Sequence, residues 1–544
     1  MIYIPYGQSK IAEEERQQNN KKFIEEELKK NQQYFNKMFE KIDPCIKLDH
    51  QQQRIIVTDE DYVMVIAGAG SGKTTTIPAK VDYLIKKKHI KPEEIVIITF
   101  TNKAVEELKD RIINEFKHEI KITTFHKFGY EIIKSINKYK PKINNAKDEI
   151  IGKIVKKELK IKDKDNYKTI KYFIKKKNII KIIKLKKNYE IDEQTYEKII
   201  QICINVISLL KSKNYSEEKL DTIKFNNRII IQFLKKIYIQ YEETLKKQNK
   251  IDFDDMINNA TEIIEREKNI NMRYKYIIID EYQDISESRY NLIKKIAEKQ
   301  KSKIIVVGDD WQCIYSFAAS NINLFTNFTN KVPYCEVLKI ENTYRNSQQL
   351  INIAGKFIQK NKKQIRKNLK SNKFLDNPVK IIKYKKEFER KLIDSLDYII
   401  EKYGEEKNIL IIGRYNFDKK EIMKSRTFEE ENGKVKYKKN KKVKIDFMTI
   451  HSSKGLGYDN VILINAKRGK FGFPSNKKNN RIIDQLVNHE TNIKYAEERR
   501  LFYVALTRTK NEIIILTPKK KQSCFIKEIR KYKNVTIKSN IIKK

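Results

Sequence analysis

A glycine-rich segment between an apolar run and a helical stretch constrains this chain more than any other feature. It reads Ala67-Gly68-Ala69-Gly70-Ser71-Gly72-Lys73-Thr74 and directly follows the apolar residues 62–66. Glycines let backbone N–H groups curl around a phosphate, and the N-terminus of the following helix favours negative charge. Lys73 would neutralise phosphate charge, and Thr74 would hold Mg²⁺. The segment predicts a phosphate-binding loop between a strand and a helix of a parallel α/β sheet.

A second feature is a pair of carboxylates after another apolar run. Asp280 and Glu281 follow Tyr276–Ile279, which predicts a buried strand. A carboxylate at this strand end faces the phosphate loop of a neighbouring strand and can hold Mg²⁺ through water. Glu281 is then placed to orient and deprotonate an attacking water. The pair predicts hydrolysis of a bound nucleotide.

Two arginines in the C-terminal half, Arg345 and Arg508, are candidates to complete this site. Guanidinium groups delivered from another lobe stabilise the charge that spreads over a phosphoryl group during transfer. If they arrive only when the lobes close, hydrolysis is coupled to domain motion. In so basic a chain a single arginine is more often a solvated surface residue, so these two stand out only through their local sequences.

The charge balance favours a polyanionic partner. The 544 residues include 116 Lys and Arg against 71 Asp and Glu, a net charge of +45. Codon bias explains lysine in place of arginine but not this excess, which indicates nucleic acid. Five scattered cysteines form no CxxC pair, which argues against a zinc site and favours a reducing compartment. No apolar run approaches the roughly 18 residues of a membrane span, so a cytoplasmic protein without a membrane partner is expected.

The order of strand and helix signals predicts four parts. They are an N-terminal helical extension (1–47), a first α/β lobe (48–129 and 252–335), a Lys-rich helical insertion (130–251) and a second α/β lobe (336–544). The second lobe is expected to contain the strands Val337–Ile340, Ile409–Ile412, Val461–Asn465 and Ile513–Leu516. Asn432-Gly433 in charged surroundings predicts an exposed β-hairpin.

Ten short motifs in a fixed order resemble those of the UvrD/Rep-type superfamily 1 DNA helicases. Besides the phosphate loop, they are Leu48–Gln52, Thr99–Ala104, Thr124–His126, Asp252–Asp255, Asp280–Asp284, Val307–Tyr315, Asn342–Arg345, Met448–Gly455 and Glu497–Arg508. The resemblance implies two RecA-like P-loop NTPase lobes with parallel sheets and flanking helices. It also implies a helical insertion (1B) in the first lobe and no large 2B-type insertion in the second lobe (2A).

The family resemblance extends the nucleotide site beyond the two acidic and two basic candidates. It implies ATP and Mg²⁺ as cofactors, with Thr74 and Asp280 on the metal. Gln52 resembles the residue that reads the adenine edge, Tyr344 the residue that stacks on the base, and Gln312 the γ-phosphate sensor. Hydrolysis is then assigned to Lys73, Glu281, Gln312, Arg345 and Arg508. The nucleotide-binding set is Gln52, Ala67, Gly68, Ala69, Gly70, Ser71, Gly72, Lys73, Thr74, Thr75, Tyr344, Arg345 and Arg508.

The resemblance also implies a single-strand DNA groove lined by rings and polar groups. Its residues would be Phe100, Thr101, Asn102, Phe125, His126, Tyr315, Phe317, Arg414 and His451. Stacking of a base on such a ring contributes about 1–3 kcal/mol and tolerates any sequence. Core packing is the competing interpretation for the rings, above all for Phe125. The chain departs from the family pattern at Phe317-Ala318, Thr75 and Gly457, which loosens one DNA contact and the nucleotide selectivity.

As a function, the resemblance implies an ATP-dependent 3′–5′ DNA helicase and single-strand translocase in DNA repair or recombination. Its partners would be single-stranded DNA, single-strand/duplex junctions and a protein that loads it, and it would be a monomer or weak dimer. One alternative is a translocase that does not unwind duplexes. Another is a nucleotide-gated DNA-binding subunit of a phage-defence or repair complex. An RNA track stays open, because the sequence has no readable 2′-hydroxyl discriminator.

Overall fold

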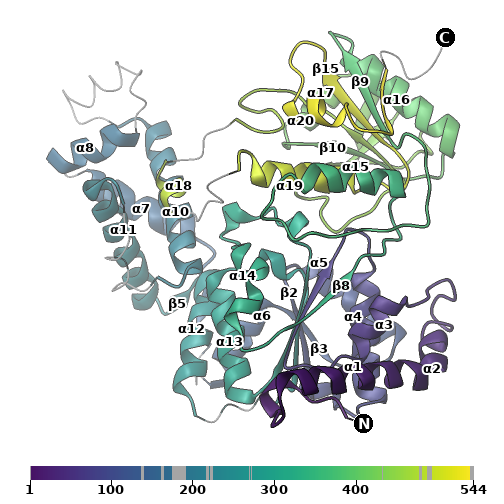
Figure 1. The fold of residues 1–544 in the computed structure, drawn as a ribbon. Coiled ribbons are helices and arrows are strands. Elements are labelled where there is room, and N and C mark those ends of the chain that lie inside the picture. Colours follow the sequence, from purple (N-terminus) through teal and green to yellow (C-terminus); the bar gives the residue numbers. More distant parts are fainter. Residues whose placement is uncertain are drawn as a thin grey trace.

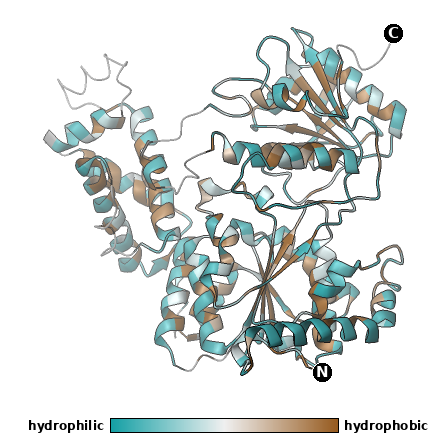
Figure 2. Ribbon diagram, viewed as in Figure 1, coloured by the Kyte–Doolittle hydropathy of each residue, from teal (hydrophilic) through white to brown (hydrophobic). Residues whose placement is uncertain are grey.

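Two large sheets, a small sheet of β4 (Lys142–Ile143) and β5 (Lys250–Ile251), and a separate group of helices are the main parts of the computed structural model (Figure 1). The structure describes residues 2–136, 140–160, 164–173, 191–215, 220, 225–268, 270, 272–431, 433–476, 481–486 and 493–538. Figure 2 shows apolar residues concentrated in the strands and polar residues on the outer helices. The predicted α/β class is confirmed: the first large sheet is parallel, and the second is parallel except for its two antiparallel edge strands.

The first sheet consists of parallel strands, and its inner strands are buried on both faces, whereas the edge strand β8 has exposed side chains. In spatial order they are β3 (Lys121–Thr124), β2 (Ile95–Thr99), β6 (Tyr276–Ile279), β7 (Lys303–Gly308), β1 (Tyr62–Ala67) and β8 (Glu336–Ile340). Side chains alternate along β1: Val63 and Val65 join the apolar cluster of helix α4 (Lys73–Lys86), while Met64 and Ile66 join the cluster on the other face. Burial on both faces explains why the inner strands β1, β2, β6 and β7 read as continuous apolar runs.

One strand expected in the second lobe belongs to the first sheet. The predicted strand Val337–Ile340 is part of β8, which pairs in parallel with β1 over Val63 to Ala67. The assignment of all residues from 336 onward to the second lobe was therefore wrong at this strand. Periodicity cannot show which of two sheets an apolar run joins, because the pairing partner lies far away in the sequence. This pairing matters for the site, because the chain after β8 places Arg345 beside the phosphate loop.

The second sheet contains the other strands predicted for that lobe. In spatial order it runs β11 (Phe428–Glu431), β12 (Lys434–Tyr437), β13 (Ile445–Thr449), β10 (Ile409–Gly413), β14 (Asn460–Leu463), β15 (Ile513–Pro518), β9 (Val379–Tyr384) and β16 (Val535–Lys538). Strands β11 and β12 pair antiparallel with Glu431 opposite Lys434, which confirms the predicted hairpin. Asn432 of its turn lies outside the described residues.

The Lys-rich insertion forms a helical body beside the first sheet (Figure 1). Its described helices are α7 (Lys147–Leu159), α8 (Lys164–Phe173), α10 (Glu193–Ser212) and α11 (Arg228–Lys247). Helix α18 (Arg481–Leu486) also joins this body, because Ile482 and Leu486 are buried in its apolar cluster. The second-lobe assignment was therefore wrong for this short helix too. We propose that the four-part division holds with these two changes.

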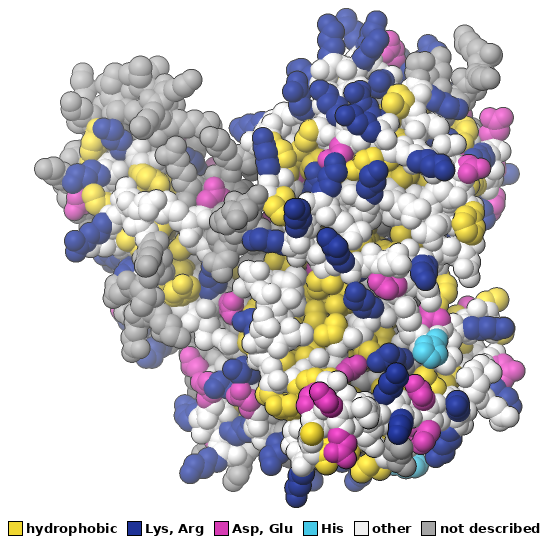
Figure 3. Space-filling model, in the orientation of Figure 1, with side chains coloured by type: hydrophobic (Ala, Val, Ile, Leu, Met, Phe, Trp, Pro, Cys, Tyr) yellow, Lys and Arg dark blue, Asp and Glu magenta, His cyan; other side chains and the backbone are white. Residues whose placement is uncertain are grey.

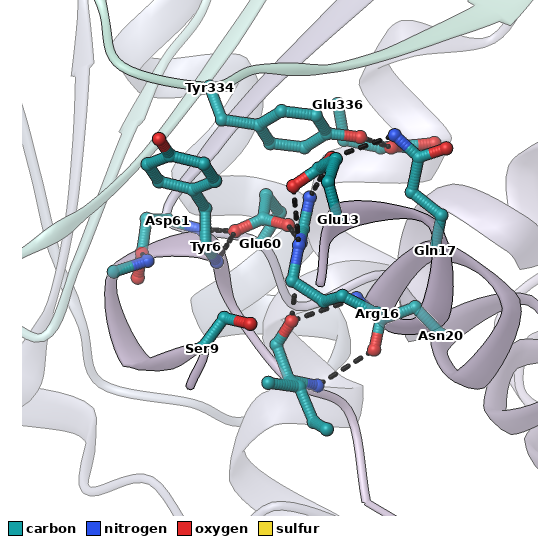
Figure 4. Close-up of polar contacts among 12 residues, drawn as sticks. Tyr6, Ser9, Glu13, Arg16, Gln17, Asn20, Glu60, Asp61, Tyr334 and Glu336 are labelled. Atoms are coloured by element: carbon teal, nitrogen blue, oxygen red, sulfur yellow. Dashed lines mark hydrogen bonds and ion pairs between the residues drawn. The ribbon is translucent and has the colours of Figure 1, made fainter. Parts of the chain in front are cut away.

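The N-terminal extension packs on the first lobe as helices α1 (Glu13–Lys30) and α2 (Gln32–Lys37). Figure 4 shows its anchor, Arg16, whose Nη1 lies 2.6 Å from Glu60 Oε2 with both side chains buried. The Arg16 guanidinium also lies 4.3 Å from the ring centre of Tyr334. Removing one partner of such a buried pair typically costs about 3–5 kcal/mol. The extension is thus fixed firmly to the nucleotide-binding lobe.

Candidate functional site

The phosphate loop has the backbone that its glycines predict. Gly70 and Gly72 adopt φ values of 71° and 82°, a left-handed region that favours glycine. A Cβ on Gly70 would lie 2.5 Å from Arg345 Cβ, and one on Gly72 would lie 2.7 Å from Gln52 Nε2. Within the described residues the buried Ser71 Oγ has no hydrogen-bond partner. A tight glycine cradle with an unsatisfied hydroxyl fits the phosphates of a nucleotide.

The catalytic candidates of the first lobe meet at the end of β6. Lys73 Nζ lies 2.7 Å from Glu281 Oε1, and Glu281 has a left-handed φ of 54°. Burial opposes ionisation of Glu281, but Lys73 and Lys454 outweigh it and hold the pKa of this carboxyl below its usual range. Burial and the neighbouring Glu281 raise the pKa of Asp280 to about 7. A cation beside Asp280 would keep it ionised, so this residue, with Thr74 at the start of α4, fits Mg²⁺.

The two arginines come from opposite ends of the second half: Arg345 lies against the phosphate loop, and Arg508 lies close enough to Arg345 to feel its charge. Tyr344 N donates to Gly70 O at 3.0 Å, which fixes Arg345 beside the loop. Arg508 is fully buried, and its guanidinium donates to the carbonyls of Val504 and Leu456 at 3.0 Å. Burial and Arg345 lower the pKa of Arg508 to about 9. Within the described residues, neither Arg345 nor Arg508 forms an ion pair. Their positive charge therefore suits a phosphoryl anion.

Gln312 connects the two halves of the site. Its Oε1 accepts from Arg508 Nη2 at 2.9 Å, and its Nε2 donates to Asp309 Oδ2 at 2.6 Å. Asp309 follows β7 of the first sheet and is ion-paired with Lys367. The Gln312 amide uses both its oxygen and its nitrogen. A displacement of Arg508 therefore also changes the hydrogen bond to Asp309 at the end of β7.

The two residues predicted to hold the base lie next to each other. Gln52 is the third residue of helix α3 (His50–Val57), where it completes a capping box with Asp49. Its Nε2 points to Ser71 O at 3.4 Å. Tyr344 is 47% exposed and donates from its hydroxyl to Asp49 Oδ2 at 2.8 Å. An exposed ring face beside an amide at the phosphate loop fits an aromatic base. Thr75, also predicted for this site, lies in the first turn of α4.

The rings predicted for the groove in the first lobe divide into half-buried members, Phe100 and His126, and a buried member, Phe125. Phe100 and Phe125 are in contact with ring centres 5.1 Å apart, and Arg289 lies over both. Phe125 is 1% exposed and packs against Phe100, so core packing accounts for its ring here, and its contact with DNA stays a prediction. The motif Thr124–His126 places an aromatic residue at this position, but it does not show whether the ring points into the core or toward the surface. His126 lies edge-on to Phe253, a ring that is 52% exposed.

Thr101 and Asn102 are both exposed beside these rings. Thr101 is the N-cap of helix α5 (Asn102–Lys109), and its hydroxyl accepts from Ala104 N at 3.2 Å. The N-terminus of α5 therefore presents free backbone N–H groups and a positive dipole end. This arrangement fits a DNA phosphate.

Tyr315, Phe317 and His451 form a second ring cluster that spans the two lobes. The ring centres of Phe317 and His451 lie 5.5 Å apart, and Tyr315 donates to His451 O at 3.2 Å. Phe317 is 68% exposed, which leaves its ring available to a base. Arg414, after β10, is ion-paired with Glu498 at 2.6 Å. The three rings thus meet as expected, while Arg414 is already neutralised.

Lys454 joins this ring cluster to the nucleotide site, a role that the sequence analysis missed. Its Nζ lies 5.1 Å from the ring centre of Tyr315, 3.6 Å from Glu281 Oε2 and in ion-pair contact with Asp284. The signal was present, because Lys454 lies in the matched motif 448–455. Lys367, which pairs with Asp309 and Asp310, lies in no motif and could not have been found.

Comparisons with known proteins agree with this geometry. The family model of the UvrD/REP helicase N-terminal domain matches residues 48–333, and that of the UvrD-like helicase C-terminal domain matches residues 420–520. DNA helicase IV of Escherichia coli is 29% identical over 503 residues, which cover 89% of this chain and 70% of that protein.

Other relatives are matched over less of their length. A probable DNA helicase II homolog of Mycoplasma capricolum is 32% identical over 60% of this chain and 43% of its own length. The ATP-dependent DNA helicase PcrA of Bacillus subtilis is 28% identical over 59% of this chain and 41% of its own length. With one family model covering more than half of the residues and a nucleotide site assembled from its motifs, the chain belongs to the UvrD/Rep family of superfamily 1 DNA helicases.

Proposed function

We propose that this chain is an ATP-driven motor that steps 3′ to 5′ along single-stranded DNA and unwinds duplexes at junctions. One observation carries the proposal: Lys454 contacts both Glu281 at the nucleotide site and Tyr315 of the exposed ring cluster. A charge change at the catalytic carboxylate is thereby transmitted to rings that can hold bases. Arg508, bonded to Gln312, provides a second connection between the lobes.

The residues suggest how a cycle would run. In the present arrangement Lys73 is bonded to Glu281, so bound phosphates must take over Lys73 and release the carboxylate for a water molecule. Mg²⁺, held through Thr74 and Asp280, would neutralise developing phosphate charge. Arg345 and Arg508 would close on the same anion from the second lobe and draw the lobes together. Hydrolysis and product release would reopen the lobes. If the ring clusters held the DNA bases alternately during this cycle, the chain would move along the strand in one direction.

The biological setting is proposed on the family alone. The relatives are named as DNA helicases, which supports DNA as the substrate. We propose action on single-stranded DNA and junctions, in the cytoplasm, in repair or recombination, with a separate loading protein. We propose a monomer or weak dimer. In the described part of the chain, no helix is both long and apolar enough to cross a membrane.

Steady-state ATP hydrolysis tests the motor. It should be measured without nucleic acid, with single-stranded DNA and with single-stranded RNA, at two salt concentrations and with Glu281→Gln as the blank. We expect strong stimulation by DNA that weakens with salt, because phosphate contacts release counterions. Equal stimulation by RNA would overturn the DNA track. Absence of stimulation together with tight ATP-dependent DNA binding would support the nucleotide-gated binding subunit instead.

A translocase without unwinding activity is the second candidate. It is favoured by the described residues between Arg345 and His451, which form second-sheet strands, helices and the hairpin β11–β12 instead of an additional large domain. Strand displacement measured beside single-strand translocation separates the two. Translocation without displacement would support this second candidate.

A further inference from the structure

Three aromatic rings gather on the surface of the second lobe outside the groove described above. Tyr415 and Phe417 follow β10, and Phe471 lies in the loop after β14. The Tyr415 and Phe417 rings stack with centres 4.9 Å apart and planes 10° apart. Phe471 meets them edge-on at 5.8 and 5.7 Å. Phe417 is 47% and Phe471 45% exposed, so this cluster leaves large apolar faces in water, which marks a contact surface.

The loops that carry the rings are held in place by their own hydrogen bonds. Asp418 Oδ2 accepts from Tyr415 N at 2.9 Å, and Asp418 Oδ1 accepts from Asn465 Nδ2 at 2.9 Å. The Tyr415 hydroxyl donates to Ser475 Oγ at 2.9 Å. Because the rings are fixed before any ligand arrives, a flat partner would stack on them at little cost in side-chain entropy.

Positive charge lies beside the rings. Lys470 Nζ lies 5.1 Å from the Phe471 ring centre. Arg414 Cζ lies 4.8 Å from the Tyr415 ring centre, but its charge is already paired with Glu498. The loop that carries Phe471 begins Lys467-Arg468-Gly469-Lys470, three cations in four residues. Figure 3 shows Lys and Arg side chains gathered over this upper part of the molecule. Rings with flanking cations suit a partner that has both π-faces and phosphates, which is single-stranded nucleic acid.

Strand register places this cluster beside the ring cluster of the lobe interface. Strands β10, β13 and β14 are parallel neighbours, with Gly413 opposite Thr449 and Ile412 opposite Leu463. The loops that follow them therefore leave the sheet at one edge. His451 lies in the loop after β13, while the three surface rings lie in the loops after β10 and β14.

From this geometry we infer that Tyr415, Phe417 and Phe471 form a base-stacking platform that continues the single-strand path from Phe317 and His451 onto the second lobe. The inference rests on the proposed function, since it presumes a DNA track. None of the three rings was among the DNA-contacting residues expected from the motifs. Phe417 would supply the most accessible face, and the cations of residues 467–470 would hold the backbone.

The test uses the full chain with the substitution Glu281→Gln, so that hydrolysis does not move the DNA. Affinity for oligothymidylates of increasing length is measured by fluorescence anisotropy at fixed salt. For long strands we expect Phe417→Ala and Phe471→Ala to weaken binding about 5- to 150-fold, the range for loss of one stacked base. Short strands, which end before the platform, should bind both variants as tightly as the parent protein.

Matched variants separate stacking from general apolar contact. Phe374→Ala removes another ring of the second lobe, 74% exposed, and should leave affinity unchanged at every length. Phe417→Tyr should retain binding, whereas Phe417→Leu should lose it at an unchanged melting temperature. Equal affinity of Phe417→Ala and parent at all lengths would overturn the platform while leaving the motor intact. A parent protein that binds no oligothymidylate would overturn the proposed function itself.

Discussion

The nucleotide site and the ring clusters differ in what holds them together. In the nucleotide site, charges that are largely shielded from water are paired or poised for a phosphate: Lys73 with Glu281, and Arg345 beside Arg508. In the clusters, neutral rings touch edge to face, as Phe317 and His451 do, or stack, as Tyr415 and Phe417 do. Charge interactions demand a fixed geometry, whereas ring contacts tolerate sliding. The hydrolysis site thus depends on charges held in a fixed geometry, whereas the proposed DNA contacts depend on rings that allow a strand to move. Lys454 contacts both regions.

The largest effect should come from the unpaired arginines. For Arg345→Ala and Arg508→Lys we expect DNA-stimulated hydrolysis to fall about 10³- to 10⁵-fold, the range for arginine fingers. Because Arg508 is fully buried and bonded to carbonyls, its variant also tests packing, and Arg345→Ala is the cleaner of the two. Turnover numbers measured alongside melting temperatures check this. Normal turnover by Arg345→Ala would remove it from the site.

Substitutions in the Lys73–Glu281 pair should separate ATP hydrolysis from ATP binding. Glu281→Gln is expected to lower hydrolysis about 10²- to 10⁴-fold, since it removes the base that orients water. ATP should still bind, because the amide does not compete for Lys73 as the carboxylate does at 2.7 Å. Lys73→Ala should abolish hydrolysis as well. Equilibrium binding of a fluorescent ATP analogue, with turnover measured in parallel, distinguishes the two roles. Turnover at the normal rate in either variant would refute the assignment.

The ring cluster should show a smaller loss that is confined to DNA affinity. Phe317→Ala is expected to weaken single-strand binding about 5- to 150-fold, because a ring that is 68% exposed loses one stacked base. Phe125→Leu, a change in a buried ring, should instead lower the melting temperature. Anisotropy titrations and thermal melts of both variants make the contrast. Equal affinity of Phe317→Ala and the parent protein would make this ring a packing residue.

The last effect concerns stability instead of activity, and it is a pH dependence from the ring clusters. Burial, then Arg289, lowers the pKa of His126 to about 4, and burial, then Arg414 and Lys454, lowers that of His451 to about 4. Unfolded histidine takes up a proton near pH 6.5, so the unfolded chain binds more protons between about pH 6.5 and 4. Stability should therefore fall as pH drops through this window, by at most about 3 kcal/mol per histidine.

Urea denaturation at several pH values measures this loss. The variants His126→Gln and His451→Gln should each flatten the acid limb of the stability curve. His89→Asn, a change at an exposed histidine, serves as the control and should keep the full slope. An unchanged slope in the double variant would show that other groups cause the acid loss.

The sequence alone determined the members of the nucleotide site and much of the fold. Glycines, Lys73, Asp280 and Glu281 could be assigned because their chemistry depends on local backbone and on strand ends, which short motifs encode. The apolar runs of both sheets and the Asn432-Gly433 hairpin were likewise local signals.

Only the tertiary structure decided which distant segments meet. It placed β8 in the first sheet, docked α18 on the helical insertion, turned Phe125 into the core and brought Lys454 to Glu281. It also stacked Tyr415 on Phe417 and set Phe471 against both. The physical reason is the same in each case. Pairing partners, ring direction and burial depend on contacts between residues far apart in the chain, and periodicity carries no information about them.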